Sequence, residues 1–326
     1  MKFLRLVKIL CIVFFLAYSS ASKAAPQDVV LGSYLTSLYN VDSDRGIFSA
    51  DIWIWTKSQN PFHYKPQDNL EISYLSSQFP LVYIGQSSEV LAGKTYYSQK
   101  KIQGTFLHDF DLAKFPFDRQ KLKIYFEDAD RSIENLKFSS DKASGFDPAI
   151  SIDGWKIMNI ETRTDVKQYQ TNFGNFTKAS DDQYSRVILE IVLKRDAPLI
   201  FLKITLGLFA AVLVAMFSTF MNAESDDLYS ARLGLLGATL LAVVVNQQFA
   251  DGKIGQTTTV TLIDSLHMLG FLTVFLLFIA AIFSRRLHGA PILGISHTVF
   301  DRFSFFVALT IFSLFSFLLI GAAVVS

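Results

Sequence analysis

The sequence has only one cysteine, Cys11, among 326 residues. A single thiol cannot form a disulfide within the chain, and this one lies in an apolar run near the N-terminus. A disulfide scaffold and thiol catalysis are therefore both excluded. An excess of charge is missing as well, because 30 Lys+Arg and 29 Asp+Glu leave a net charge of +1. A nucleic-acid partner, which would require a basic face, is not expected.

Recognisable catalytic arrangements are also missing. We find no nucleophile beside a base, no glycine-rich phosphate-binding loop and no His, Cys or Asp residues at metal-ligand spacing. Of the five histidines, His108 and His267 could sense pH, although lone histidines are more often packing residues. We therefore expect a protein that is not an enzyme and that needs no metal or other cofactor.

Apolar residues are abundant and unevenly distributed. They make up 51% of the chain, and Phe alone occurs 31 times. Residues 25–196 contain 20 Lys+Arg and 23 Asp+Glu, whereas residues 197–326 contain only six of each. The first region has the charge density of a soluble domain and the second that of a membrane domain. We expect two domains, 25–196 and 197–326.

The N-terminus has the pattern of a secretory signal. Three basic residues precede an apolar run over 9–16, and a small–x–small cleavage site follows at 22–24. We expect residues 1–24 to be a signal peptide and the rest of the chain to enter or cross the membrane. An uncleaved membrane anchor is the alternative.

The first domain has the pattern of short strands. Alternating aromatic and β-branched residues are separated by Gly, Asn, Asp and Pro. The strands are expected at 29–38, 48–55, 70–74, 121–126, 155–162 and 184–193. The last has few polar positions and should lie deep in the structure. The pattern favours a β-sandwich.

Four apolar segments follow, each near the roughly 20 residues that cross a bilayer as a helix. They cover residues 198–220, 231–250, 259–283 and 303–325. With the first domain exported, four crossings leave the loop 284–302 inside, where its three arginines agree with the positive-inside rule. We expect a multi-pass protein of the cell (inner) membrane, with the N-terminal domain and the C-terminus outside.

The second segment contains polar residues, which are costly in lipid. On a helix, steps of three and four residues put small, branched apolar and amide side chains on one face. This predicted pore-lining face consists of Gly234, Ala238, Leu241, Val245 and Gln248. An apolar ring of Leu241 and Val245 could gate a water-filled pore by dewetting. A pore implies a closed ring of subunits, whereas the alternative is an ordinary span whose small residues allow close helix packing.

Residues 115–120, FPFDRQ, resemble the β6–β7 loop of the Cys-loop receptor superfamily, the pentameric ligand-gated ion channels. His108 and Leu122 stand where animal members have two cysteines, which is typical of bacterial members. Residues 230–233 resemble the start of the family's pore helix, and the register from there places its mid-pore leucine on Leu241. The resemblance implies a homopentamer around a central pore, each subunit with an extracellular immunoglobulin-like β-sandwich of about ten strands and a transmembrane four-helix bundle.

The resemblance also implies how the two domains communicate. In the family, the β1–β2 loop, the proline-containing loop and an arginine before the membrane meet at the domain junction. The corresponding residues here are Asp44, Arg45, Pro116, Phe117, Asp118 and Arg195. An ion pair of Arg195 with Asp118 or Asp44 would order the junction, and the alternative is a set of separate solvated charges.

Family members bind small ligands between adjacent extracellular domains, in a box of aromatic side chains that favours cationic groups. The resemblance assigns this role to Glu127, Tyr169, Tyr184 and Trp53. Trp53 and Trp55 are two positions apart on a strand and so point the same way. We expect at least one of these two tryptophans to lie in the core.

Glu224, Asp226 and Asp227 precede the second apolar segment. Repeated by each subunit, they would form an acidic ring that attracts cations at the inner mouth. Arg232 has the opposite sign, and in relatives a basic residue at this position faces away from the pore.

The sequence thus predicts a cation-selective channel opened by a small extracellular ligand or by a pH change, with the lipid bilayer and permeant ions as its other partners. The alternative is a membrane-anchored extracellular sensor that binds a ligand without conducting ions. A sensor would need a signalling domain inside the cell, and the loop 284–302 is too short to contain one.

Overall fold

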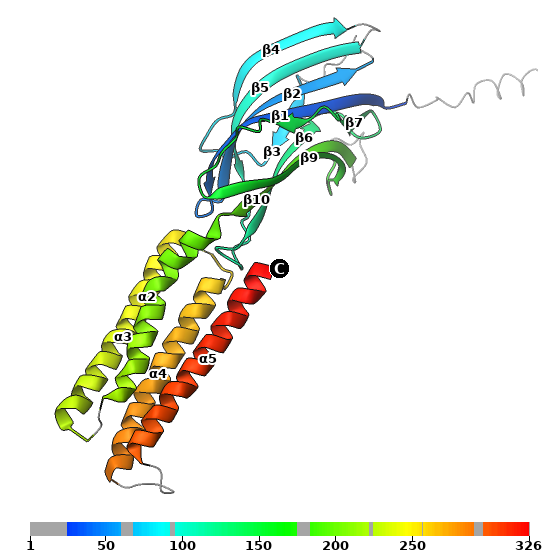
Figure 1. The fold of residues 1–326 in the computed structure, drawn as a ribbon. Coiled ribbons are helices and arrows are strands. Elements are labelled where there is room, and N and C mark those ends of the chain that lie inside the picture. The colour runs from blue at the N-terminus through cyan, green and yellow to red at the C-terminus, as the bar shows by residue number, and fades with distance from the viewer. Residues whose placement is uncertain are drawn as a thin grey trace, which may run out of the picture.

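The computed structural model describes residues 25–59, 68–91, 95–174, 183–221, 224–255, 257–289 and 296–325. They form a β-sandwich followed by a bundle of four long helices (Figure 1). The last strand ends at Arg195 and the first helix begins at Ala197. The expected signal peptide, 1–24, lies outside the described residues.

The sandwich has two sheets. The first has the strand order β4-β5-β2-β1-β7, with β8 also paired to β1, and the second has the order β3-β6-β10-β9. The strands of the first sheet are β1 (Gln27–Asp42), β2 (Ile47–Ser58), β4 (Val82–Leu91), β5 (Thr95–Leu107), β7 (Leu136–Ser140) and β8 (Gly145–Phe146). Those of the second are β3 (Leu70–Ser73), β6 (Arg119–Asp128), β9 (Trp155–Gln168) and β10 (Gln183–Arg195).

One hydrophobic core lies between the sheets, because alternate residues of each strand point inward. The first sheet contributes Leu31, Ile52 and Phe106, and the second contributes Ile124 and Leu189, all almost completely buried. β10 lies between β6 and β9 and is buried along most of its length, as its sequence predicted. The core makes the sandwich a scaffold that carries loops at both ends.

All six expected strands are present, but β1 and β9 run four and six residues beyond their expected ends; β4, β5, β7 and β8 were not predicted. β4 has no buried position, so no inward-facing residues mark it in the sequence. β5 does alternate, but its polar positions include two adjacent lysines, Lys100 and Lys101, of which the first is buried.

The helices are α2 (Ala197–Phe217), α3 (Asp226–Ile254), α4 (Leu262–Gly289) and α5 (His297–Val325). A 3₁₀ turn, Ser218–Phe220, follows α2. All four are long and apolar enough to cross a membrane. α3 packs against α2 and α4, and α5 packs mainly against α4.

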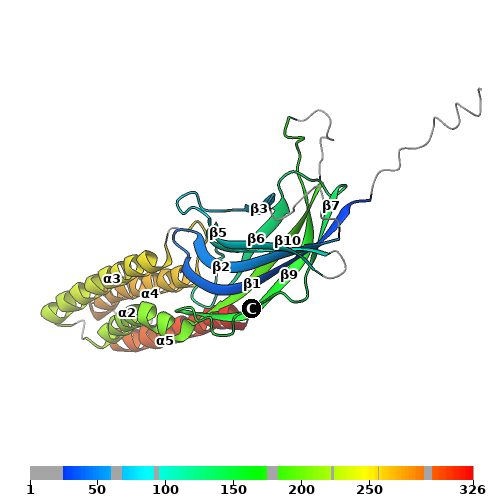
Figure 2. The same cartoon turned by 90° about the horizontal axis from the view of Figure 1, so that it is seen from above.

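The bundle lies beyond one end of the sandwich in both views (Figures 1 and 2). Successive helices run in opposite directions, so the start of α2, the end of α3, the start of α4 and the end of α5 all lie near the sandwich (Figure 1). The end of α2, the start of α3, the end of α4 and the start of α5 lie at the far end (Figure 1). We call the first set of segments, with the sandwich loops they meet, the domain junction.

Candidate functional site

Helix α3 has two distinct faces. One face, which includes Arg232, Leu236 and Val243, is buried against the other helices. The predicted pore-lining residues lie on the opposite face, and each is exposed in the single chain: Gly234, Ala238, Leu241, Val245 and Gln248. The exposed fraction is 64% for Leu241 and 54% for Val245. Of the four helices, α3 is also the least apolar, so a face that could meet water is combined with a face that holds the helix in the bundle.

The buried Arg232 shows how the face of α3 that packs against the other helices is held in place. Its Nη2 donates to Oδ1 of Asp301 in α5 at 2.9 Å, and the hydroxyl of Ser284 in α4 donates to the other oxygen of Asp301 at 2.7 Å. Arg232 is completely buried and Asp301 nearly so. The positive charge therefore points away from the Leu241 face, as expected, and is neutralised inside the bundle.

The three acidic residues before and in the first turn of α3 do not share one direction. Glu224 lies beside His288 and His297 of α4 and α5, with carboxylate–imidazole distances of 3.9 and 3.3 Å. Asp226 pairs with the guanidinium of Arg285 in α4. Asp227 is exposed, and it alone of the three is seven residues, two helical turns, before Gly234. Glu224 and Asp226 thus contact side chains of other helices, whereas Asp227 continues the Leu241 face; the acidic ring itself stays a prediction.

An ion pair orders the domain junction. Arg195, at the end of β10, donates from Nε to Oδ1 of Asp118 at 2.7 Å and from Nη2 to Oδ2 at 3.0 Å. The guanidinium lies 4.1 Å from the ring centre of Trp155, and Asp118 also accepts from Gln120 at 2.7 Å. The expected pair is therefore present with Asp118, and bidentate geometry in a buried setting makes it strong. Arg45 is not part of this ion pair, since its guanidinium forms an exposed pair with Asp42 at 3.7 Å.

The proline-containing loop contacts the helices directly. The backbone N–H of Leu262, at the start of α4, donates to the carbonyl of Ala113 at 3.0 Å. Phe117 packs on Phe201 of α2, with ring centres 5.3 Å apart. A cluster of buried apolar residues continues these contacts into three helices: Leu112, Phe115, Ile204, Ala250, Ile254 and Ile263. Pro116 lies inside this loop, after a cis peptide bond.

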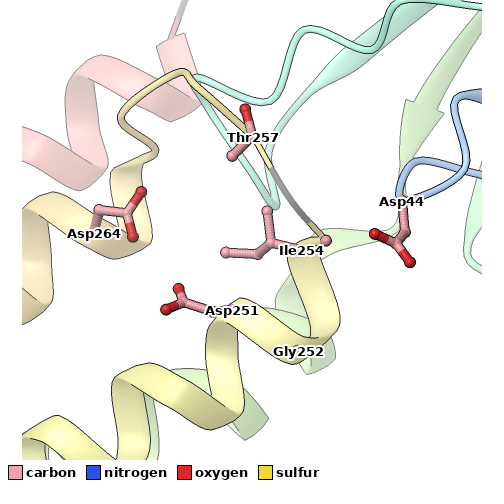
Figure 3. A pocket seen from close by; sticks show the side chains of 7 residues that line it. Asp44, Asp251, Gly252, Ile254, Thr257 and Asp264 are labelled. Atoms are coloured by element: carbon pink, nitrogen blue, oxygen red, sulfur yellow. The ribbon is translucent and has the colours of Figure 1, made fainter.

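The β1–β2 loop contacts the end of α3. Gly255 follows α3 in a left-handed conformation, with φ +85°, and a Cβ there would lie 2.7 Å from Cα of Asp44. Asp44 also lines a pocket of about 590 Å³ together with Asp251 of α3 and Asp264 of α4 (Figure 3). Asp44 is thus in direct contact with Gly255, in the segment that joins α3 to α4.

A second pocket lies on the sandwich, between the end of β6 and the ends of β9 and β10. Its volume is about 410 Å³, and it is lined by Glu71, Glu127, Tyr169, Phe173 and Tyr184, among others. The three aromatic rings contact one another edge to face, with centres 5.4 to 6.5 Å apart. The pocket combines aromatic faces with carboxylates, which suits a small cation.

Glu127 is the buried acid of this aromatic pocket. The hydroxyl of Tyr169 donates to its Oε1 at 2.5 Å, and Oε2 has no hydrogen-bond partner among the described residues. Burial raises the pKa of Glu127 above its usual value, against a smaller opposing effect of the Tyr169 hydrogen bond. The pKa of Tyr169 is raised by burial and by this carboxylate. A bound cation would relieve the cost of keeping Glu127 ionised. Phe173 also lines the pocket and was not predicted, because it lies in a loop, where no strand or helix spacing marks a residue.

Trp53 is not part of this pocket. It lines a separate surface pocket of about 470 Å³ on the other sheet, with Tyr34, Trp55 and Tyr97. Ile52 and Ile54 occupy the core instead, and both tryptophans are only half-buried on the outer face of β2. The expectation that one tryptophan lies in the core was therefore wrong. Within one chain Trp53 and Tyr169 are on different sheets, so they could share a ligand only across a contact between two chains.

The two histidines considered as pH sensors are both packed. His108 is flanked by Phe48 and Phe110, and burial lowers its pKa. His267 lies in the bundle, where its ring nitrogens are 2.8 Å from the carbonyl of Ile263 and 2.9 Å from Oδ1 of Asn246. Both have the surroundings of structural residues.

Comparison with known proteins adds no assignment: no protein-family model matches the chain, and none of the curated proteins matches it. What the chain does is therefore inferred from the residues and contacts above.

Proposed function

We propose that the chain is one subunit of a homopentameric ligand-gated ion channel of the Cys-loop receptor superfamily, related to its bacterial members. The observation that carries the proposal is the two-faced α3, which packs on the bundle through Arg232 and Val243 and leaves the Leu241 face uncovered. A closed ring of copies would turn that face toward a common axis and enclose water.

Leu241 and Val245 would form the gate. Neither is charged or bulky enough to plug a wide opening, but a ring of such side chains repels water when the pore is narrow. A small outward movement or rotation of α3 would then be sufficient to admit water and ions. Gly234 and Ala238 leave the pore wider toward the inner end.

Cations are the proposed permeant ions. Asp227 extends the Leu241 face by two turns toward the inner mouth and is exposed, whereas the nearest positive charge on α3, Arg232, is paired with Asp301 inside the bundle. A ring of Asp227 carboxylates would concentrate cations at the mouth.

The signal would pass through the domain junction. A change in the sandwich reaches α3 and α4 by two routes: the β1–β2 loop through Asp44 at Gly255, and the proline-containing loop through Ala113 at Leu262. The Arg195–Asp118 ion pair connects the proline-containing loop of the second route to β10, the strand that leads into α2.

The ligand would be a small organic cation, such as a primary amine, bound to the aromatic pocket around Glu127. In a ring of subunits, the face with Trp53 of one copy would cover the aromatic pocket of the next. We place the bundle in the cell membrane, with the sandwich and the C-terminus outside, because Arg285 and Arg286 near the end of α4 and Arg302 near the start of α5 lie at the end of the bundle far from the sandwich.

The experiment is to purify the chain, count its subunits and record from planar bilayers while amines are added on the sandwich side. Pentamers that conduct sodium after amine addition, with a reversal potential that follows the sodium gradient, are expected. Monomers, or pentamers that bind an amine without conducting, would instead support the alternative, a membrane-anchored sensor that conducts no ions.

A further inference from the structure

Three metal-ligating side chains meet at the end of the bundle far from the sandwich. Glu224 precedes α3, His288 is in the last turn of α4 and His297 begins α5. One ligand atom of each lies within 4.8 Å of the other two. Nε2 of His297 is 3.3 Å, and Nδ1 of His288 is 3.9 Å, from Oε1 of Glu224. The cluster therefore joins three helices at one point.

His297 supplies a second, independent observation. The residue is nine-tenths buried, yet its Nε2 has no hydrogen-bond partner among the described residues, although it faces the Glu224 carboxylate. A buried polar atom without a partner costs about 1–3 kcal/mol. The His288 ring packs edge-on against that of His297, with centres 5.2 Å apart, and keeps both imidazoles at the cluster. A buried nitrogen aimed into a group of ligand atoms is suited to a metal ion.

Two imidazoles and one carboxylate are a ligand set for Zn²⁺, with a fourth position left for water. Ligand atoms around a tetrahedral zinc ion are separated by about 3.3 Å, which the Glu224–His297 distance already matches, and the remaining distances, none above 4.8 Å, require a contraction. Glu224 and His288 can supply it, because their side chains are 50% and 41% exposed. Ca²⁺ and Mg²⁺ are disfavoured because they prefer oxygen ligands.

The surrounding charges do not oppose a cation. Arg285 donates to the backbone carbonyl of Glu224 at 2.8 Å, but its charge is paired with Asp226. Arg232 is paired with Asp301. The Glu224 carboxylate lies beside both imidazoles, at 3.3 and 3.9 Å.

We propose that Glu224, His288 and His297 form a binding site for Zn²⁺. The bound ion would tie the start of α3 to α4 and α5, and would stabilise the arrangement described here against any in which α3 moves away. In the channel proposed above, on which this consequence rests, zinc on the cytoplasmic side would act on the inner end of the pore helix.

Binding is tested on the full chain, purified in detergent without a polyhistidine tag and stripped with a chelator. Co²⁺ is titrated and followed by its visible absorption, and Zn²⁺ is then used to displace it. We expect one Co²⁺ per chain, and His288→Ala and Glu224→Gln should each weaken binding at least about tenfold, since even loss of a residue that only supports a metal ligand has that effect. Thr298→Ala, an exposed neighbour of His297, should bind like the unmodified chain.

A melting experiment guards against variants that simply fail to fold. Zn²⁺ should raise the melting temperature of the unmodified chain and of Thr298→Ala, but not of His288→Ala or Glu224→Gln. No tetrahedral Co²⁺ spectrum, or equal binding by all four proteins, would overturn the proposal.

Currents separate this proposal from the channel itself. Zinc on the side far from the sandwich should change the open probability of the unmodified chain and not that of His288→Ala. Metal binding by a chain that never conducts would leave the zinc site intact and refute the channel. Zinc-insensitive currents from a chain that binds no Co²⁺ would refute the zinc site and leave the channel proposal intact.

Discussion

Arg195 and Asp118 form a two-point ion pair between the strand that leads into α2 and the loop that contacts α4. The Asp118 side chain is 1% exposed and that of Arg195 is 11% exposed, so water screens the pair little. The Trp155 and Phe115 rings cover the guanidinium. The pair therefore adds a charged side-chain contact where β-sheet pairing already joins the two parts, through Lys194 opposite Arg119 and the N–H of Arg195 donating to the carbonyl of Asp118.

Removal of this pair should uncouple the two domains. In Arg195→Ala, Asp118 is left buried and unpaired, which typically costs about 3–5 kcal/mol. We expect subunits that still assemble, melt at a lower temperature and give no amine-evoked current. Lys156→Ala is the matched control, because Lys156 forms an exposed pair with Asp196, and such pairs contribute about 0–1 kcal/mol. Unchanged amine-evoked currents in Arg195→Ala would refute the coupling role.

The contact between Gly255 and Asp44 is tested by Gly255→Ala, with Gly252→Ala, three residues earlier, as the control. In Gly255→Ala the new Cβ would meet Asp44 at 2.6–2.7 Å and would require φ +85°, whereas at Gly252 nothing lies within 4 Å. A strained backbone position of this kind costs about 1–3 kcal/mol. We expect Gly255→Ala to displace the β1–β2 loop and to raise the amine concentration needed for half-maximal current. Gly252→Ala should behave like the unmodified chain; equal behaviour of the two variants would argue against contact through Asp44.

The buried Arg232–Asp301 pair should support the bundle rather than conduction. We expect Asp301→Ala to destabilise the protein by about 3–5 kcal/mol, because Arg232 would be left charged inside the bundle. Arg302→Ala, at an exposed neighbouring position, should change stability by less than about 0.5 kcal/mol. Thermal unfolding in detergent measures both. If Asp301→Ala altered cation selectivity without a loss of stability, Arg232 would have to be reassigned to the pore.

Glu127→Gln should make the sandwich more stable and the channel less sensitive to amine. Because burial raises the pKa of Glu127, its ionised form at pH 7 disfavours the folded state. This penalty decreases as the pH falls through the raised pKa and disappears below the unfolded value. The melting temperature of Glu127→Gln should therefore exceed that of the unmodified chain at pH 7, and the difference should shrink on acidification.

The same substitution removes the negative charge opposite a bound amine. At least tenfold more amine should be needed for half-maximal current, which corresponds to about 1.4 kcal/mol. Glu71→Gln, at an exposed position of the same pocket, should leave the melting temperature unchanged. A lower melting temperature for Glu127→Gln at pH 7 would contradict the proposed cost of ionisation.

Much of this arrangement could be predicted from local patterns. The scarcity of polar residues marked β10 as a deeply buried strand, and apolar length marked all four helices. The Leu241 face followed from helical spacing alone. β4 could not be predicted, because an edge strand without buried residues carries no alternation.

The remaining differences come from contacts between distant parts of the chain. Spacing shows that Trp53 and Trp55 share a face but not which face meets the core, and the isoleucines Ile52 and Ile54 take that place. The sequence places Glu224 and Asp226 just before and at the start of α3 but does not show their partners. In the fold, Asp226 pairs with Arg285 of α4 and Glu224 lies beside His297 of α5. No sequence motif joins Glu224 with His288 and His297, so the proposed metal site is visible only in the fold.

The most direct test is water accessibility of α3 in the membrane. Single cysteines are introduced into a Cys11→Ser background and treated with a charged, membrane-impermeant thiol reagent. Leu241→Cys and Gln248→Cys should react in the presence of amine and block the current, whereas Phe317→Cys, on the 75% exposed side chain of α5 that we expect to face lipid, should not. If Leu241→Cys reacts no faster than Phe317→Cys, the Leu241 face meets lipid or protein, and the channel proposal is contradicted.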